Sequence, residues 1–167
     1  DGDMDVAAAY YSGVAWFENN GTGSFSFRQM YSSSDYAQSV YAADNHGDGL
    51  VDWLSASTQN AIEWHRNTGS SSFPTQPVTS SEVFIQNMLT VDLDHDGDLD
   101  AVGATRWYEN DGNGNFTVQF DPNSGLAATD FAAADVDGDG DIDLVAGRGS
   151  NGVAWYRNNG GQNFTYR

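Results

Sequence analysis

The feature that most constrains this chain is an acidic nine-residue pattern, Asp-x-Asp-x-Asp-Gly-Asp-x-Asp, that recurs along it. Two copies are intact, at residues 92–100 and 135–143. Alternate residues of a tightly curled loop can direct several carboxylates at one centre, and glycine permits the sharp bend that closes the loop. Because hard cations prefer oxygen ligands, the pattern predicts calcium sites. We expect side-chain ligands from positions one, three, five and nine, and a backbone carbonyl from position seven.

Two further copies are altered. The third keeps the frame with Asp44, His46, Asp48, Gly49, Leu50 and Asp52. Leu50 is harmless at a position that supplies only a carbonyl, but imidazole is a poor calcium ligand, so we expect this site to be weaker, water-bridged or empty. The fourth copy is cut, and matches only positions five to nine with Asp1, Gly2, Asp3 and Asp5. A chain that starts inside such a pattern is expected to be a piece of a longer protein.

The acidity of the chain is local. The formal net charge is −18, and most of the aspartates lie within the four copies. Carboxylates packed this closely repel one another, so a bound cation should stabilise the fold. The six basic residues are all arginine and form no basic stripe, which argues against binding to nucleic acid or insertion into a membrane. A 39% hydrophobic and 13% aromatic content favours a folded domain over disorder.

Calcium chemistry also bears on location. The chain has no cysteine, which fits either a reducing compartment or a secreted protein that uses metal in place of disulfides. Because multi-carboxylate loops are most useful where calcium is abundant, we expect an extracellular or cell-surface protein. Three Asn-x-Thr sequons, at Asn20, Asn115 and Asn163, are glycosylation candidates in a eukaryotic secretory pathway. Two of them occupy the same place in a repeat, so common descent is an alternative reason for their presence.

Each acidic pattern belongs to a larger repeat. The last aspartates of the copies, Asp5, Asp52, Asp100 and Asp143, are spaced by 43 to 48 residues. A second landmark keeps step: a tryptophan-led strand, a glycine-bearing turn and a phenylalanine. The tryptophans are Trp16, Trp64, Trp107 and Trp155, and the phenylalanines are Phe25, Phe73, Phe116 and Phe164. Internal repeats of this period suggest propeller blades or solenoid units, here at residues 1–40, 41–88, 89–131 and 132–167.

The strand pattern favours a propeller. Each repeat contains about four short strand-like stretches, for example residues 130–134, 142–146, 153–157 and 164–166, and no stretch has a helical period. Residues 14–17 are apolar on both faces, as expected of a sheet sandwiched between neighbours. We therefore predict an all-β chain, a β-propeller of four-stranded antiparallel blades, with about four blades visible and the first lacking its innermost strand. We expect a single region within a larger propeller; closure as a four-bladed ring is the alternative.

At this point the repeat resembles the FG-GAP or VCBS repeat of calcium-binding β-propellers of the integrin alpha-chain type. The matching features are the loop at residues 135–143, the following Leu144-Val145, and the stretch Trp155-Tyr156-Arg157-Asn158-Asn159-Gly160. The resemblance implies calcium in the loop between the first two strands of a blade. The implied ligands are Asp92, Asp94, Asp96, Asp98 and Asp100, and Asp135, Asp137, Asp139, Asp141 and Asp143; Asp44, Asp48 and Asp52, and Asp1, Asp3 and Asp5, form the doubtful or incomplete sets.

Other readings of these residues are weaker. EF-hands need a glutamate at loop position twelve, where this chain has Gly103, Ala146 and Ser55, and thrombospondin-type calcium repeats need cysteines. The repeated tryptophans could stack on sugar rings, but their regular place favours packing between blades. Trp53 breaks the pattern and is the better candidate for an exposed contact, although burial is favoured there too. His46, His65 and His95 are scattered, and no catalytic constellation converges.

Three functions follow. The first is a non-catalytic, extracellular, calcium-stabilised module for adhesion or recognition of a protein or glycan, as the resemblance implies. The second is a structural subunit of an extracellular filament or surface assembly, for which self-association would be expected. The third is an accessory domain of a secreted polysaccharide-active enzyme. Fold alone does not choose among them.

Overall fold

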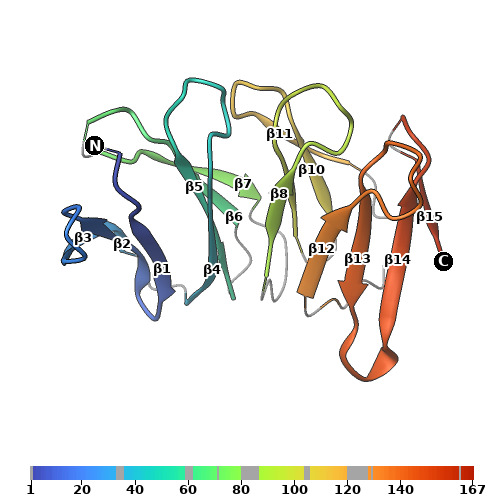
Figure 1. Cartoon of the computed structure of the whole chain (residues 1–167), viewed down its shortest axis with the longest axis horizontal. Helices are drawn as coiled ribbons and strands as arrows, with labels where there is room; N and C mark the ends of the chain where they lie inside the picture. Colours follow the sequence, from blue (N-terminus) through green and yellow to red (C-terminus); the bar gives the residue numbers. More distant parts are fainter. Residues whose placement is uncertain are drawn as a thin grey trace.

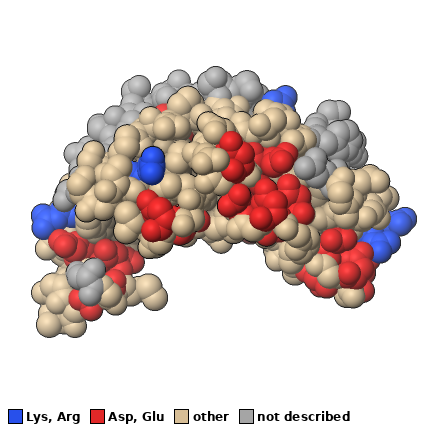
Figure 2. Space-filling model, turned by 90° about the horizontal axis from the view of Figure 1, so that it is seen from above, with Lys and Arg blue, Asp and Glu red and all other residues tan. Residues whose placement is uncertain are grey.

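A computed structural model describes residues 2–32, 36–58, 62–70, 72–79, 87–103, 106–119, 128, 130–161 and 163–167. Four antiparallel sheets stand side by side in chain order (Figure 1). Seen from above, they follow an open arc and do not close into a ring (Figure 2). The chain is all-β, as predicted. The described part contains no α-helix, only a single 3-10 turn η1 (Gly149–Asn151), and hence no helix long and apolar enough to cross a membrane.

Each sheet is a simple meander of neighbouring strands. The first has three strands: β1 (Val6–Tyr10), β2 (Gly13–Asn19) and β3 (Phe25–Ser32). The second has β4 (Ala37–Ala43), β5 (Asp52–Ser57), β6 (Ile62–His65) and β7 (Thr75–Thr79). The third has β8 (Leu89–Val91), β9 (Asp100–Val102), β10 (Trp107–Asn110) and β11 (Phe116–Val118). The fourth has β12 (Asp130–Ala134), β13 (Asp143–Gly147), β14 (Val153–Asn158) and β15 (Phe164–Tyr166).

The sheets are arranged as propeller blades, and we number them blades 1 to 4. The first strands of the three four-stranded blades, β4, β8 and β12, lie beside one another in succession. Within the described residues blade 1 has no strand equivalent to these, and its β1 lies beside β4 instead. The prediction that the first blade lacks its innermost strand agrees with this arrangement. Whether the chain belongs to a larger propeller stays a prediction, as do the repeat limits.

The hydrophobic core lies between blades. One buried cluster joins blades 2 and 3, and includes Leu54, Ile62, Ala101 and Tyr108. A second joins blades 3 and 4, and includes Val102, Leu144, Ala146 and Tyr156. Strand β5 is buried along its whole length, on both faces. This is the pattern expected when each sheet is covered on both sides by neighbours.

The repeated tryptophans pack between blades. Edge-to-face ring contacts run from Trp16 to Phe73, from Trp64 to Phe116 and from Trp107 to Phe164, in each case to the phenylalanine of the next blade. Packing, rather than sugar stacking, therefore explains their regular spacing. Trp53 is also buried, at 7% exposure, and contacts Phe73 edge to face. The burial that was favoured for Trp53 is confirmed, and an exposed contact at this position is not supported.

Candidate metal centre

Three complete acidic loops occupy equivalent places in the structure. Loop 2 (residues 44–52), loop 3 (residues 92–100) and loop 4 (residues 135–143) each join the first strand of a blade to the second, and they emerge at the same end of the sheets (Figure 1). Loop 1 (residues 1–5) leads into β1. Asp1 lies outside the described residues. Acidic side chains consequently gather in separate patches along the arc (Figure 2).

The first aspartate of each loop holds the curl. Its carboxylate accepts the N–H of the position-six glycine: Gly49 to Asp44 at 2.8 Å, Gly97 to Asp92 at 3.1 Å and Gly140 to Asp135 at 3.0 Å. These glycines have φ between 86° and 98°, a backbone conformation that other residues rarely adopt. The fifth residue of each loop accepts the N–H of position seven, at 2.9 to 3.0 Å. Glycine thus closes the loop as the sequence predicts.

The curl brings potential ligand atoms together. In loop 3, one carboxylate oxygen from each of Asp92, Asp94 and Asp96 lies within 4.8 Å of the others. The same criterion joins Asp135, Asp137 and Asp143 in loop 4, and Asp44, His46 and Asp48 in loop 2. An all-carboxylate oxygen set is the chemistry that a hard divalent cation requires. These groups could hold a metal ion, and the donors of loops 3 and 4 fit calcium.

The remaining expected ligands lie outside these groups. Position-seven side chains turn toward the glycine-bearing turn of the tryptophan strand: a Cβ on Gly160 would lie 3.3 Å from Asp141 Oδ2, and Asp98 lies against Gly112 in the same way. The position-seven backbone carbonyl stays a predicted ligand. Partial desolvation, and then the charges of Asp96 and Asp92, raises the pKa of Asp98. The carboxylates of loop 3 thus repel each other.

The last aspartate of each loop, which we call the position-nine aspartate, is fully buried in blades 2, 3 and 4. In loop 4, Asp143 accepts the N–H of Asn158 at 2.7 Å with Oδ1 and that of Val136 at 3.1 Å with Oδ2. Asp52 and Asp100 accept equivalent pairs, and Asp5 accepts the N–H of Asn19 at 2.8 Å. Burial raises the pKa of Asp100 to about 7, although its two N–H donors oppose this. These residues therefore have a structural role besides any ligation.

Sequence reasoning assigned no role to the asparagine that stands three residues after each repeated tryptophan. Asn19, Asn67, Asn110 and Asn158 donate their side-chain Nδ2 to the carbonyl of loop position eight at 3.0 to 3.2 Å. Their backbone N–H groups hold the position-nine aspartates. The signal was present, since an asparagine stands at the same place in all four repeats.

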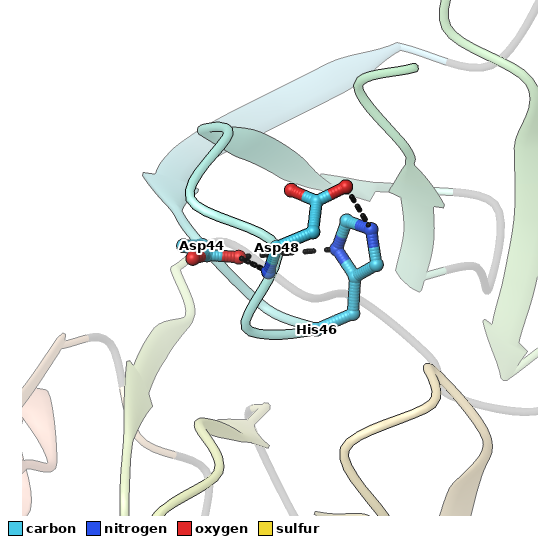
Figure 3. A group of neighbouring side chains, drawn as sticks. All are labelled: Asp44, His46 and Asp48. Atoms are coloured by element: carbon cyan, nitrogen blue, oxygen red, sulfur yellow. Dashed lines mark hydrogen bonds and ion pairs between the residues drawn. The ribbon is translucent and has the colours of Figure 1, made fainter. Parts of the chain in front are cut away.

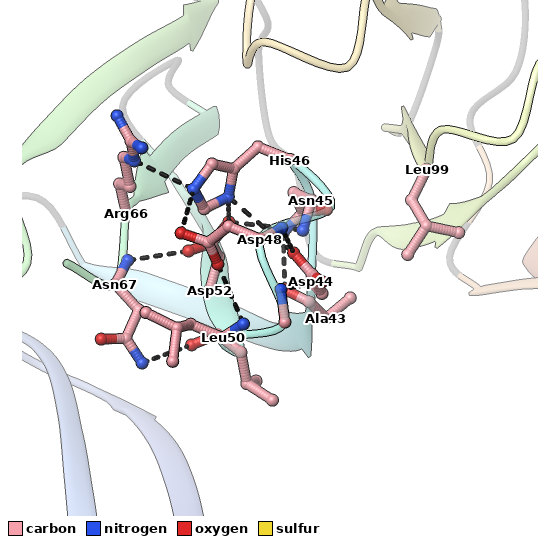
Figure 4. A network of polar contacts seen from close by, with 12 residues as sticks. Ala43, Asp44, Asn45, His46, Asp48, Leu50, Asp52, Arg66, Asn67 and Leu99 are labelled. Atoms are coloured by element: carbon pink, nitrogen blue, oxygen red, sulfur yellow. Dashed lines mark hydrogen bonds and ion pairs between the residues drawn. The ribbon is translucent and has the colours of Figure 1, made fainter. Parts of the chain in front are cut away.

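His46 fills loop 2 with its imidazole (Figure 3). Its Nδ1 lies 2.8 Å from Asp52 Oδ2 and 3.9 Å from Asp44 Oδ1, and its Nε2 lies 2.8 Å from Asp48 Oδ2. Arg66 Nε also donates to His46 Nε2 at 3.0 Å, within a wider network of polar contacts (Figure 4). Despite opposing desolvation, N–H donors from Gly49 and Asp48 lower the pKa of Asp44. Loop 2 thus offers mixed nitrogen and oxygen donors, which calcium disfavours.

An arginine also lies over loop 4. Arg157 Nε is 2.5 Å from Asp137 Oδ2, and Arg157 Nη2 is 2.9 Å from Asp139 Oδ2. The N–H of Asp141, and then Arg157, lowers the pKa of Asp139. At the equivalent place in blade 3 stands Glu109, whose carboxylate accepts a hydrogen bond from Gln119. Loops 3 and 4 therefore differ in their built-in charge, which the loop pattern alone does not reveal.

The sequon asparagines lie on exposed turns. Asn20, Asn115 and Asn163 are all exposed. Asn20 Oδ1 accepts Thr22 Oγ1 at 2.7 Å, and Asn115 Nδ2 donates to Asp111 Oδ2 at 2.8 Å. Their glycosylation stays a prediction.

Comparison with protein families identifies the type of repeat. The family model of the FG-GAP-like repeat matches the chain three times, at residues 1–52, 46–103 and 101–146. The chain belongs to the FG-GAP-like repeat family. FG-GAP repeats are propeller blades, in agreement with the four sheets, and the resemblance identified from the loop and the tryptophan strand is confirmed. The chain has no significant match among curated proteins or solved structures.

Proposed function

We propose that this FG-GAP chain is a non-catalytic, extracellular, calcium-stabilised β-propeller module that recognises a protein or a glycan. FG-GAP repeats are typical of extracellular proteins and often bind calcium, which supports both the location and the ion. Fold and family do not identify a ligand, so the recognition step is the part that needs a direct test.

The observation that carries the calcium proposal is the carboxylate group of loop 3. Asp92, Asp94 and Asp96 converge within 4.8 Å, and desolvation, with a further contribution from the neighbouring carboxylates, raises the pKa values of Asp98 and Asp100. A divalent ion would neutralise the converging carboxylates and hold the first half of the loop together. When bound, calcium supplies a structural cross-link. An ion saturated by protein oxygens has little room to activate water, so a catalytic role is not proposed.

The test of recognition uses the purified chain on arrays of glycans and immobilised extracellular matrix proteins, with calcium and with excess chelator. We expect selective binding that disappears in chelator. A matched variant, Asp92→Asn with Asp94→Asn, should lose the same binding in calcium. Binding that persists equally in chelator would contradict a calcium-dependent module. Self-association without any array binding would favour the structural-subunit alternative, with Asn20, Asn115 and Asn163 as candidate glycan carriers.

A further inference from the structure

A buried hydrogen bond joins loop 2 to loop 3. Asn110 Nδ2 donates to the backbone carbonyl of Asn45 at 2.6 Å, across the boundary between blades 2 and 3. The N–H of Asn45 donates to Asp52, the position-nine aspartate of loop 2, at 3.3 Å. The N–H of Asn110 donates to Asp100, the position-nine aspartate of loop 3, at 3.0 Å. One asparagine thus connects the last aspartates of two loops.

The same connection recurs between blades 3 and 4. Asn158 Nδ2 donates to the carbonyl of Leu93 at 3.0 Å. The N–H of Leu93 donates to Asp100 at 3.0 Å, and the N–H of Asn158 donates to Asp143 at 2.7 Å. The two connections share Asp100. A continuous chain of hydrogen bonds, which we call the relay, therefore passes from loop 2 through loop 3 to loop 4.

The relay is withdrawn from water. Asn110, Asp100 and Asp143 are fully buried, and Leu93 and Asn158 are each 1% exposed. When a buried polar group loses its hydrogen-bond partner, water cannot replace that partner. Each member of the relay therefore favours conformations in which the neighbouring hydrogen bonds are formed. Each relay asparagine contacts the position-two carbonyl of one acidic loop and the position-nine carboxylate of the next. Ordering one loop consequently positions an anchor for the next.

We propose that the relay couples the acidic loops, so that calcium bound in one loop raises the calcium affinity of the adjacent loop. Asn110 and Asn158 act as positioning residues that carry this coupling from blade to blade. The inference rests on the proposed calcium binding. Coupling between two sites is reciprocal, so loop 4 strengthens binding at loop 3 by the same factor as loop 3 strengthens binding at loop 4.

The chain supplies its own control residue. Asn67 occupies the same place in blade 2, and its Nδ2 donates to Val51 of its own loop at 3.1 Å. Among the described residues it has no acceptor in a neighbouring blade. Asn67→Leu removes the side-chain hydrogen bond to the carbonyl of loop position eight in its own blade, and Asn158→Leu removes the equivalent bond in blade 4. Only Asn158→Leu also removes a bond to the neighbouring blade, so Asn67→Leu leaves the relay intact.

The test is a double-mutant cycle on the full chain. Calcium binding at loop 4 is followed through the amide resonance of Gly140, with loop 3 intact or disabled by Asp92→Asn and Asp94→Asn. We expect disabling loop 3 to weaken loop 4 at least about fivefold, the lower range for allosteric coupling. In the Asn158→Leu background the same change should be less than about twofold, whereas Asn67→Leu should leave the full factor. An equal factor in the Asn158→Leu background would overturn the relay.

A second measurement leaves the relay unaltered, in case Asn158→Leu does not fold. With loop 4 disabled by Asp135→Asn and Asp137→Asn, calcium bound at loop 3 should slow hydrogen exchange of the Asn158 amide by at least about fivefold, by the same coupling. An unchanged exchange rate would overturn the inference. If the amide resonances of Gly97 and Gly140 show that loops 3 and 4 bind calcium independently of each other, the relay alone would be overturned. No calcium response at either glycine would overturn both the relay and the proposed function.

Discussion

Asp143 and Asn158 lie in adjacent strands of blade 4, and the carboxylate of Asp143 accepts the backbone N–H of Asn158 at 2.7 Å. The other carboxylate oxygen accepts the N–H of Val136 at the start of the loop. The last aspartate of the pattern therefore fastens loop 4 to its blade, whether or not it also contacts a cation. Asp139, by contrast, is exposed and faces Arg157.

Replacing Asp143 should destabilise the chain even without calcium. Asp143→Ala leaves two backbone N–H groups without their acceptor, so we expect a loss of about 3 kcal/mol or failure to fold. Asp139→Ala should cost less than about 1 kcal/mol in chelator, because its ion pair is exposed, and should mainly reduce calcium binding. Denaturant unfolding in chelator compares the two. Similar losses for both variants would contradict the fastening role of Asp143.

Arg157 should compete with calcium for loop 4. Its guanidinium contacts Asp137 and Asp139, which a calcium ion would also attract. Arg157→Gln is expected to raise calcium affinity at loop 4 severalfold and to change calcium-free stability by less than about 1 kcal/mol. Arg28→Gln is a suitable control, since it breaks an exposed ion pair of 3.0 Å with Glu18. Unchanged or weaker calcium binding in Arg157→Gln, measured by calcium titration, would argue against competition.

Gly114 should tolerate no side chain. It has φ +80° and lies against the ring of Trp64 in the preceding blade, where a Cβ would clash. Gly138 in loop 4 has φ +79°, but a Cβ there would meet nothing within 4 Å. Gly138→Ala should cost about 1 kcal/mol for the backbone alone, and Gly114→Ala about 2–4 kcal/mol because overpacking is added. Chemical denaturation should show this difference, and equal costs would refute the close packing of these blades.

Two buried groups give the calcium-free protein opposing pH dependences. His65 lies between Ser55 and Thr75, and burial lowers its pKa to about 4. Between about pH 6.5 and 4, His65 binds a proton in the unfolded chain but not in the folded chain. The free energy of unfolding therefore decreases as pH falls through this range. The pKa of Asp100 is raised to about 7, so its contribution is lost as pH rises from about 4 to 7. The two effects nearly cancel between these limits.

Asp100→Asn should therefore reveal the pH dependence of stability that comes from His65. In chelator, we expect wild-type unfolding free energy to change little between about pH 4.5 and 6.5, whereas the variant should lose up to about 1.4 kcal/mol per pH unit on acidification. His65→Gln should show the reverse slope. Denaturant unfolding at several pH values measures both. If the Asp100→Asn profile is parallel to wild type, the raised pKa of Asp100 would be refuted.

The sequence predicted the elements that are set by local pattern. The expected strands at 130–134 and 164–166 coincide with β12 and β15. The expectation at 142–146 is displaced from β13 by one residue at both ends, and that at 153–157 is one residue shorter than β14 at its end. Alternation of residues along strands, and Gly-rich turns between them, are enough to place such elements.

Contacts between strands could not be predicted in the same way. Loop spacing places Asp137 and Asp139 close together, but strand register decides that Arg157 lies over them. The edge-to-face contact of Trp53 with Phe73 also joins residues that are distant in sequence. The relay through Asn158 likewise depends on how blades pack. These features require tertiary structure because no local pattern encodes them.

The most direct test of calcium stabilisation is a thermal melt of the purified chain in calcium and in excess chelator, with a metal count on the same sample. The account predicts a clear fall in melting temperature in chelator and at least two calcium ions per chain, from loops 3 and 4, with a third if loop 2 also binds. No bound calcium and an unchanged melting temperature would contradict it, and would leave the acidic loops as turns held by their own hydrogen bonds.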